Sequence, residues 1–214
     1  MNKMTEIIFI IDRSGSMNGL QSDTIGGYNS FLEQQKQEEG EAMVTTVLFN
    51  NRMQVIHDRE SIANVRPLTA RDYIPGGSTA LLDAVGDTVS EITRRQETFP
   101  KGRPDSTVAV IITDGYENSS RHYTYPDIRN LIKAREEAGW KFVFLGANID
   151  AEETAETLGM DRRYASRYHA DAAGTRNNYD TLSAAVRHMR RGRTLTPEDL
   201  EGIRQDYRKR GGKH

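Results

Sequence analysis

The chain has 214 residues, a formal net charge of −2 and no cysteine. A chain of this length can form one domain with a core large enough to be stable without covalent cross-links. Without cysteine, disulfides, thiolate metal ligands and cysteine nucleophiles are excluded, and nothing indicates an oxidising compartment. The apolar run at residues 7–11 is too short for a signal peptide or a membrane span. We therefore expect a cytoplasmic protein that does not enter a membrane.

Basic residues are concentrated at the C-terminal end. Residues 187–214 contain nine Lys or Arg and four Asp or Glu, so this segment has a charge of about +5 and the rest of the chain about −7. We interpret residues 1–192 as one domain and residues 193–214 as a basic helical extension. A basic segment can bind nucleic acid, but a solvated helix end is the more common explanation of such a pattern.

Short apolar runs alternate with longer segments of helical periodicity along the chain. This alternation predicts an α/β fold with a doubly wound, mainly parallel sheet and helices on both of its faces. Asn50 and Asn51 can form a tight hairpin between the second and third strands, so we expect the third strand to be antiparallel and at one edge. The six expected strands are residues 6–11, 43–49, 53–57, 107–113, 141–145 and 163–168.

Helices are expected where apolar residues recur every three or four positions. Gly26 and Gly27 fall in the first turns of the first helix and are expected to weaken it. Ser78 or Thr79 stands where the helix from residue 80 needs an N-cap, and Thr196 begins the last helix. The other helices are expected at residues 23–39, 125–138, 151–158 and 178–190, and the one from residue 80 ends at residue 94.

Two aspartates directly follow strongly apolar strands. Asp12 ends the run IIFIID, and Asp114 ends the run VAVIITD. Both side chains are therefore expected at the carboxyl end of the sheet, where ligands bind in open α/β folds. If the two strands are neighbours, the carboxylates converge, and converging carboxylates repel each other unless a cation joins them.

Hydroxyl side chains accompany these aspartates. Ser14 and Ser16 follow Asp12 on a tight turn, and Thr79 follows two glycines at the start of a helix. Carboxylate and hydroxyl oxygens suit Mg²⁺ or Mn²⁺. No histidine or thiolate is placed near them in the sequence, which argues against zinc.

The segments DRSGS (residues 12–16), GGSTAL (residues 76–81) and DG (residues 114–115) occur in one order and in matching structural contexts. Together they resemble the metal-ion-dependent adhesion site of von Willebrand factor A domains, a family that includes the inserted domains of integrins, and the resemblance extends over roughly residues 5–150. It implies a Rossmann-like fold and a stand-alone protein of bacterial or phage type.

The resemblance also implies a set of ligands. Asp12, Ser14 and Ser16 would hold one Mg²⁺ or Mn²⁺ per chain, and Thr79 and Asp114 would contribute directly or through water. An open coordination position would be filled by an Asp or Glu of a partner protein. A desolvated carboxylate is attracted far more strongly by a divalent ion than by a surface lysine.

On these grounds we predict a metal-dependent protein interaction module and not an enzyme. Loop residues at the same edge of the sheet are expected to form a rim that contacts the partner. For any one of them, ordinary loop packing is an equal alternative. The rim residues are Arg13, Met17, Asn18, Tyr116, Glu117, Asn118 and Asn148.

Three alternatives stay open at this point. The hydroxyl residues could serve only as helix caps. A metal-dependent hydrolase acting on phosphate or ester could use Mg²⁺ beside a serine, although the sequence has no P-loop and no G-x-S-x-G motif. The basic extension could bind nucleic acid, in which case binding would weaken steeply with salt. The sequence does not define the oligomeric state.

Overall fold

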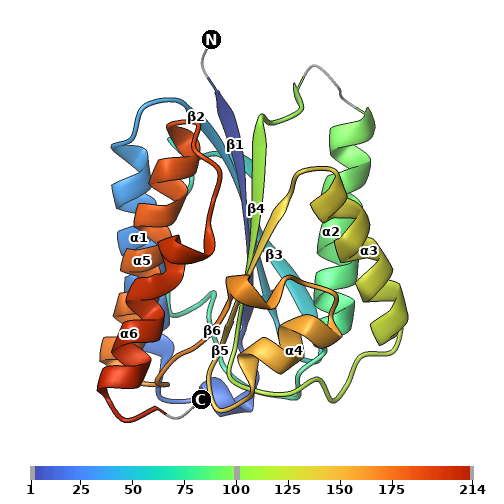
Figure 1. Ribbon diagram of the computed structural model, residues 1–214. Coiled ribbons are helices and arrows are strands. Elements are labelled where there is room, and N and C mark those ends of the chain that lie inside the picture. Colours follow the sequence, from blue (N-terminus) through green and yellow to red (C-terminus); the bar gives the residue numbers. More distant parts are fainter. Residues whose placement is uncertain (1–2, 99–101, 213–214) are drawn as a thin grey trace.

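A six-stranded sheet with the strand order β3-β2-β1-β4-β5-β6 lies between two layers of helices (Figure 1). The structure is a computed structural model that describes residues 3–98 and 102–212. Neighbouring strands are parallel throughout, except for β2 and β3. The strands are β1 (Met4–Asp12), β2 (Glu41–Phe49), β3 (Met53–Ser61), β4 (Ser106–Thr113), β5 (Lys141–Gly146) and β6 (Ala165–Arg167).

The helices divide between the two faces of the sheet. Figure 1 shows α1, α5 and α6 on one side and α2, α3 and α4 on the other. The predicted doubly wound α/β architecture, with β3 as its antiparallel edge strand, is therefore confirmed. The helices are α1 (Gln21–Lys36), α2 (Leu81–Thr98), α3 (Tyr125–Glu137), α4 (Ala151–Thr157), α5 (Ala172–Arg190) and α6 (Glu201–Lys209).

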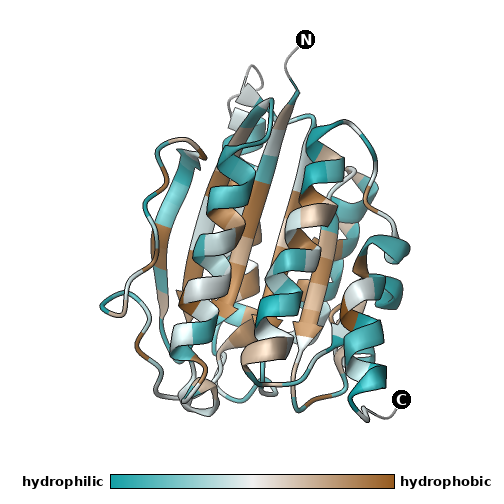
Figure 2. Cartoon of the chain, turned by 90° about the vertical axis from the view of Figure 1, so that its left-hand side faces the viewer, coloured by the Kyte–Doolittle hydropathy of each residue, from teal (hydrophilic) through white to brown (hydrophobic). Residues whose placement is uncertain are grey.

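Strand β1 is buried on both faces. Ile7, Phe9 and Ile11 belong to the apolar cluster that includes residues of α1 and α5, whereas Ile8 and Ile10 belong to the cluster that includes α2 and α3. Figure 2 shows the apolar strands behind helices whose outer surfaces are mainly hydrophilic. Burial on both faces explains why the sequence of β1 is a continuous apolar run and not an alternating one.

Strands β1 and β4 are parallel neighbours, with Ile11 opposite Ile112. The chain leaves β1 through α1 to reach β2 on one side, and it leaves β4 through α3 to reach β5 on the other side. These diverging connections create the crevice at the carboxyl ends of the strands where ligands collect in such sheets. Asp12, at the end of β1, and Asp114, just after β4, both lie at this crevice.

Helices α1 and α5 pack closely at a glycine. Helix α1 begins at Gln21, so Gly26 and Gly27 lie inside it and not in its first turn. A Cβ atom at Gly27 would lie 2.3 Å from Cδ2 of Tyr179 in α5, whereas a Cβ atom at Gly26 would have nothing within 4 Å. Gly27 therefore permits the close approach of the two helices.

Two elements after β5 differ from the prediction. Strand β6 has only three residues, because a 3-10 turn at Arg162–Tyr164, capped by the side chain of Asp161, occupies the start of the expected strand. Helix α5 begins at Ala172 and not at residue 178, because the side chain of Asp171 caps it by accepting a hydrogen bond from the N–H of Gly174.

The C-terminal segment packs on the rest of the chain. Leu195, Leu200 and Ile203 belong to the same apolar cluster as the residues of α1 and α5, and α6 contacts α5 and β6. The domain boundary at residue 192 stays a prediction, and residues 213–214 of the extension lie outside the described residues. In the part of the chain that the structure describes, no helix is long and apolar enough to cross a membrane.

One of the basic residues near the C-terminus is part of the core. Arg190 is 5% exposed, and its guanidinium donates to the main-chain carbonyl oxygens of Gln35, Glu38 (3.0 Å) and Gly40 (2.8 Å). The segment therefore presents less uncompensated positive charge than its composition indicates. Other arginines of the segment form ion pairs with acidic side chains: Arg187, Arg191, Arg204, Arg208 and Arg210.

Candidate metal centre

Asp12 is held at the end of β1 by three hydrogen bonds. Its Oδ1 accepts from the N–H of Ser14 at 2.6 Å, and its Oδ2 accepts from the hydroxyl of Thr113 at 2.6 Å. The buried hydroxyl of Tyr73 donates to the main-chain carbonyl of Asp12 at 2.5 Å. The carboxylate of Asp12 is therefore fixed in position and direction before any ligand binds.

The two serines and Asp114 form a chain of hydrogen bonds. Oγ of Ser14 lies 3.1 Å from Oγ of Ser16, which donates to Oδ1 of Asp114 at 2.5 Å. Ser16 lies on a 3-10 turn at Gly15–Met17, and Asp114 follows β4. The structure thus brings the serine turn after β1 into direct contact with the aspartate after β4.

Thr79 reaches the same place from the segment that returns from β3. Its N–H donates to Oδ1 of Asn118 at 2.8 Å, and its carbonyl accepts from the N–H of Asn118 at 3.0 Å. A Cβ atom on Gly115 would lie 3.5 Å from Oγ1 of Thr79 and 3.6 Å from Oγ of Ser16. The hydroxyls of Thr79 and Ser16 therefore flank Gly115, next to Asp114.

The hydroxyl groups at this place do not cap helices. Ser14 precedes the 3-10 turn but makes no capping hydrogen bond, and the hydroxyl of Thr79 makes no hydrogen bond within residues 3–98 and 102–212. The first N–H groups of α2 are instead satisfied from another loop: Leu82 donates to Glu117 at 3.0 Å, and Asp83 donates to Ser120 at 3.0 Å. The interpretation that these hydroxyls serve only as caps is therefore wrong.

The two carboxylates carry uncompensated negative charge. Asp12 is 0% exposed and Asp114 is 4% exposed. Burial raises the pKa of Asp12 to about 6, against the lowering effect of its hydrogen bonds with Thr113 and Ser14, and burial also raises the pKa of Asp114. No basic side chain is among the main causes of either shift. A bound cation would remove the cost of burying these two charges side by side.

The donor set fits a hard cation. No group of three or more His, Cys, Asp or Glu side chains that could hold a metal occurs in the described ranges. The candidate centre instead combines two carboxylates with three hydroxyls, all of them oxygen donors. Such donors suit Mg²⁺ or Mn²⁺, which keep part of their water shell and need few charged ligands.

Four of the expected rim residues are exposed: Asn18, Tyr116, Asn118 and Asn148. Asn148 has a left-handed main-chain conformation, with φ of 57°, and lines the hollow beside Ser16 and Asp114. Tyr116, the one aromatic residue of the predicted rim, is exposed, and its hydroxyl accepts a hydrogen bond from the N–H of Asp150 at 3.3 Å. These residues surround the candidate centre and are accessible to a partner.

The other rim residues have structural roles. Met17 is 1% exposed and belongs to the apolar core, so its predicted place on the rim is wrong. The 3-10 turn Gly15–Met17 carries its side chain into the apolar cluster that also includes residues of α1. The carboxylate of Glu117 satisfies main-chain N–H groups at the start of α2 and in its own loop. Arg13 is half-buried and donates to Oε1 of Gln54 at 2.7 Å.

Two residues of the centre were not predicted from the sequence. Thr113, expected only as part of a strand, orients the carboxylate of Asp12. Tyr73 lies in the segment between β3 and α2, to which no structure was assigned, and it reaches Asp12 from there. A hydroxyl residue at the last position of β4, directly before Asp114, was the available signal for Thr113, whereas no local pattern identifies Tyr73.

The sheet, its switch point and the cluster of oxygen-bearing side chains at its carboxyl edge define an open, doubly wound α/β domain with a candidate metal centre. A sequence model of the von Willebrand factor type A domain matches residues 6–183, and the chain belongs to this family. Such domains are commonly metal-dependent protein interaction modules. A sequence comparison with curated proteins found no significant match.

Solved structures share the fold at low identity. The pilus adhesin SpaC from Lactobacillus rhamnosus GG is 12% identical, with a TM-score of 0.64 over 87% of this chain and 30% of that chain. The vWF domain of the type V pilus tip protein Mfa5 from Porphyromonas gingivalis is 9% identical, with a TM-score of 0.60 over 92% of this chain and 99% of that chain. Proximal thread matrix protein 1 from the mussel byssus has a zinc-occupied metal-ion-dependent adhesion site (MIDAS) motif. It is 18% identical, with a TM-score of 0.54 over 85% of this chain and 45% of that chain. The chain thus spans less than half the length of two of these three proteins.

Proposed function

We propose that the chain binds one Mg²⁺ or Mn²⁺ and uses it to bind an Asp or Glu side chain of a partner protein. The observation that carries this proposal is the hydrogen bond between Ser16 and Asp114, which joins two distant loops beside the buried carboxylate of Asp12. The mussel protein with a similar fold and a zinc-occupied MIDAS motif supports a metal-binding role. The residues that would hold the ion are Asp12, Ser14, Ser16, Thr79 and Asp114.

The charges of the centre make partner binding depend on the metal. Asp12 and Asp114 would repel a third carboxylate that approached without a cation. A bound ion supplies the positive charge that attracts such a carboxylate. Ser16 is the exposed member of the set and lies at the mouth of the hollow that Asn18 and Asn148 also line. A partner's side chain therefore approaches the centre past the exposed Ser16, and the buried carboxylate of Asp12 lies on the inner side of the centre.

Calorimetric titration with Mg²⁺, Mn²⁺ and Zn²⁺ tests the metal site. We expect one ion per chain for wild type and no heat of binding for Asp12→Ala. The matched control is Asp87→Ala, which removes an exposed carboxylate from α2. Circular dichroism should show that all three proteins are folded, because Asp12 is at the edge of the core and the sheet does not depend on an ion. Equal heats for wild type and Asp12→Ala would refute the site.

A second experiment tests partner binding. The wild-type chain is used to capture proteins from a lysate of its source in Mg²⁺ and in EDTA, with Asp12→Ala as the control. A partner captured in Mg²⁺ and lost both in EDTA and with the variant is the expected result. Capture that is the same in all three samples would show that binding does not pass through the metal.

A further inference from the structure

The hollow beside the candidate metal centre continues along the carboxyl edge of the sheet. Ser16 and Asp114 line its first part, together with Asn148 and Ala170. Asn148 and Ala170 also line the adjoining hollow, which extends to the exposed ring of Tyr116. The two hollows therefore adjoin each other and form a depressed surface that leads away from the metal centre.

The depression ends in a pocket between β6, α4 and α6. The second hollow and this pocket share Asp150, Arg167 and Tyr207. The pocket has a volume of about 270 Å³, which is ample for a carboxylate or phosphate group and its bound water. We name the whole surface, from Ser16 through Asn148 to this pocket, the edge trough.

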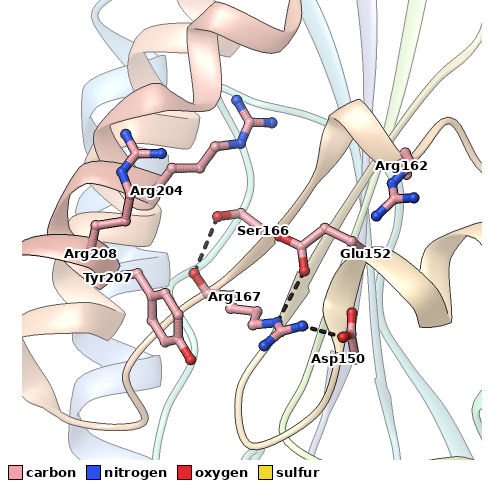
Figure 3. Close-up of a pocket in the computed structure, with 8 residues that line it drawn as sticks. All are labelled: Asp150, Glu152, Arg162, Ser166, Arg167, Arg204, Tyr207 and Arg208. Atoms are coloured by element: carbon pink, nitrogen blue, oxygen red, sulfur yellow. Dashed lines mark hydrogen bonds and ion pairs between the residues drawn. The ribbon is translucent and has the colours of Figure 1, made fainter. Parts of the chain in front are cut away.

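The pocket at the end of the edge trough is lined by more positive than negative charge. Four arginines and two carboxylates line it (Figure 3). Both carboxylates, Asp150 and Glu152, pair with the same arginine, Arg167. The other three lining arginines therefore face the pocket without a lining counter-charge: Arg162, Arg204 and Arg208.

Two of these arginines keep hydrogen-bond donors for a ligand. Arg208 pairs with Glu201, and Arg162 lies 3.5 Å from Glu156, neither of which lines the pocket. A guanidinium has five N–H donors, so a single acidic partner leaves several unused. The side chains of Arg208 and Arg162 are 40% and 60% exposed.

Arg204 has a different role. It donates to the main-chain carbonyls of Pro197 and Arg163, which ties α6 to the turn before β6. This connection fixes the wall of the pocket that carries Arg208. The pocket thus has one anchored arginine that maintains its shape and two exposed arginines that can turn toward an anion.

We propose that Arg162 and Arg208 form a second anion subsite, and that the partner segment is an extended acidic stretch with two anionic groups. The first would bind at the metal centre and the second, a carboxylate or a phosphate, between these arginines. Two strand spacings separate β4 from β6, which is about 10 Å, and an extended chain rises about 3.3 Å per residue. Arg162 precedes the start of β6 and so lies back from the carboxyl edge; with this depth and the further reach to α6, the two anionic groups should be roughly four to six residues apart. This inference rests on the proposed function.

Three synthetic peptides with the same Ser/Ala background test the proposal in Mg²⁺. The first has one Glu, the second has two Glu four positions apart, and the third has phosphoserine in place of the second Glu. We expect the wild-type chain to bind the second peptide about five- to tenfold more tightly than the first, from two exposed charge-assisted contacts. The double variant Arg162→Gln/Arg208→Gln should lose this gain and bind the one-Glu peptide as wild type does.

The control is Arg94→Gln, which removes an exposed, ion-paired arginine from α2 and should keep the full gain. Thermal unfolding should be nearly unchanged in all variants, because the substituted side chains are exposed. A tighter complex with the phosphoserine peptide would identify phosphate as the second anion, and equal affinity would identify carboxylate.

The outcomes separate this inference from the proposed function. If wild type prefers the two-Glu peptide by less than twofold, or the double variant keeps the preference, the second subsite is refuted while metal-dependent binding of the first Glu stands. No detectable binding of the two-Glu peptide at millimolar concentration also refutes it. If EDTA leaves binding of the one-Glu peptide unchanged, the metal-dependent function fails, and a preference that survives EDTA supports the arginine subsite alone.

Discussion

The hydroxyl of Ser16 donates to a carboxylate oxygen of Asp114 at 2.5 Å, although the two residues are 98 positions apart in the sequence. One lies on the turn that follows β1 and the other directly after β4. Because β1 and β4 are parallel neighbours, the bond joins the two loops that diverge at the switch point of the sheet. The side chain of Ser16 therefore has both a structural partner and a place in the candidate metal centre.

Ser16→Ala should separate these two roles. We expect the free energy of unfolding of the metal-free protein to fall by about 1–2 kcal/mol, since one hydrogen bond to a partly buried carboxylate is lost. The affinity for Mn²⁺ should fall at least about tenfold, because the variant loses either an oxygen ligand of the ion or a group that orients the ligand Asp114. Urea unfolding and calorimetry measure the two effects. An unchanged Mn²⁺ affinity would exclude Ser16 from the ligand set.

Adjacent glycines in α1 should respond in opposite directions to alanine. Gly26→Ala should raise the free energy of unfolding by about 0.5–1 kcal/mol, because the site is open and alanine favours the helix. Gly27→Ala should lower it by about 1–3 kcal/mol, because the new methyl group overlaps the buried ring of Tyr179. Urea unfolding of the two variants tests this pair, and a shift of the same sign in both would contradict the packing of α1 on α5.

Asp72 should make stability depend on pH. Its carboxylate accepts hydrogen bonds from Arg66 at 2.8 and 2.9 Å, and the hydrogen bonds from Arg66 and then those from Thr69 hold the pKa of Asp72 well below its usual value of 3.8. A depressed pKa in the folded state means that this stabilisation is complete above the unfolded value and is lost as the pH falls below it.

Asp72→Asn is therefore expected to be destabilised by about 1–2 kcal/mol at neutral pH, and the difference from wild type should shrink as the pH falls below about 4. Unfolding in urea at pH 7 and at about pH 3 provides the comparison. A difference that is constant over this range would mean that the charge of Asp72 is not what stabilises the loop.

Arg190 should be important for stability and its neighbour Arg191 should not. Arg190→Gln leaves the carbonyls of Gln35, Glu38 and Gly40 without their buried donor, and we expect a loss of about 2–4 kcal/mol. Arg191→Gln removes a side chain that is 65% exposed and pairs with Glu38, and we expect a loss below about 1 kcal/mol. Thermal unfolding distinguishes the two, and similar losses would show that Arg190 acts only through its charge.

The sequence predicts the fold because the strands are buried on both faces and end at polar residues. Apolar runs that stop at Asp12 and Asp114 locate both the strands and the edge where the candidate centre forms. The paired asparagines likewise locate the hairpin before the edge strand β3. These features depend on local patterns of a few residues, and local patterns are what a single sequence displays.

Features that depend on long-range packing were not predictable in this way. The inward direction of Met17 and the hydrogen bond from Tyr73 to Asp12 are set by how distant segments pack, and neither residue has a distinctive local pattern. Arg190 illustrates the same limit. Arginine is usually a surface residue, but the partners of Arg190 are main-chain carbonyl oxygens that follow the C-terminal end of α1.

The direction of β1 determines how the protein can be attached to a support or to another chain. The strand begins at Met4 and runs to Asp12, so its start lies at the end of the sheet opposite the candidate metal centre. Helix α6 ends at Lys209, close to Tyr207 of the edge trough. Tethering ahead of β1 would leave the centre facing solution, whereas tethering after α6 would place the tether beside the trough and shield it from large binding proteins.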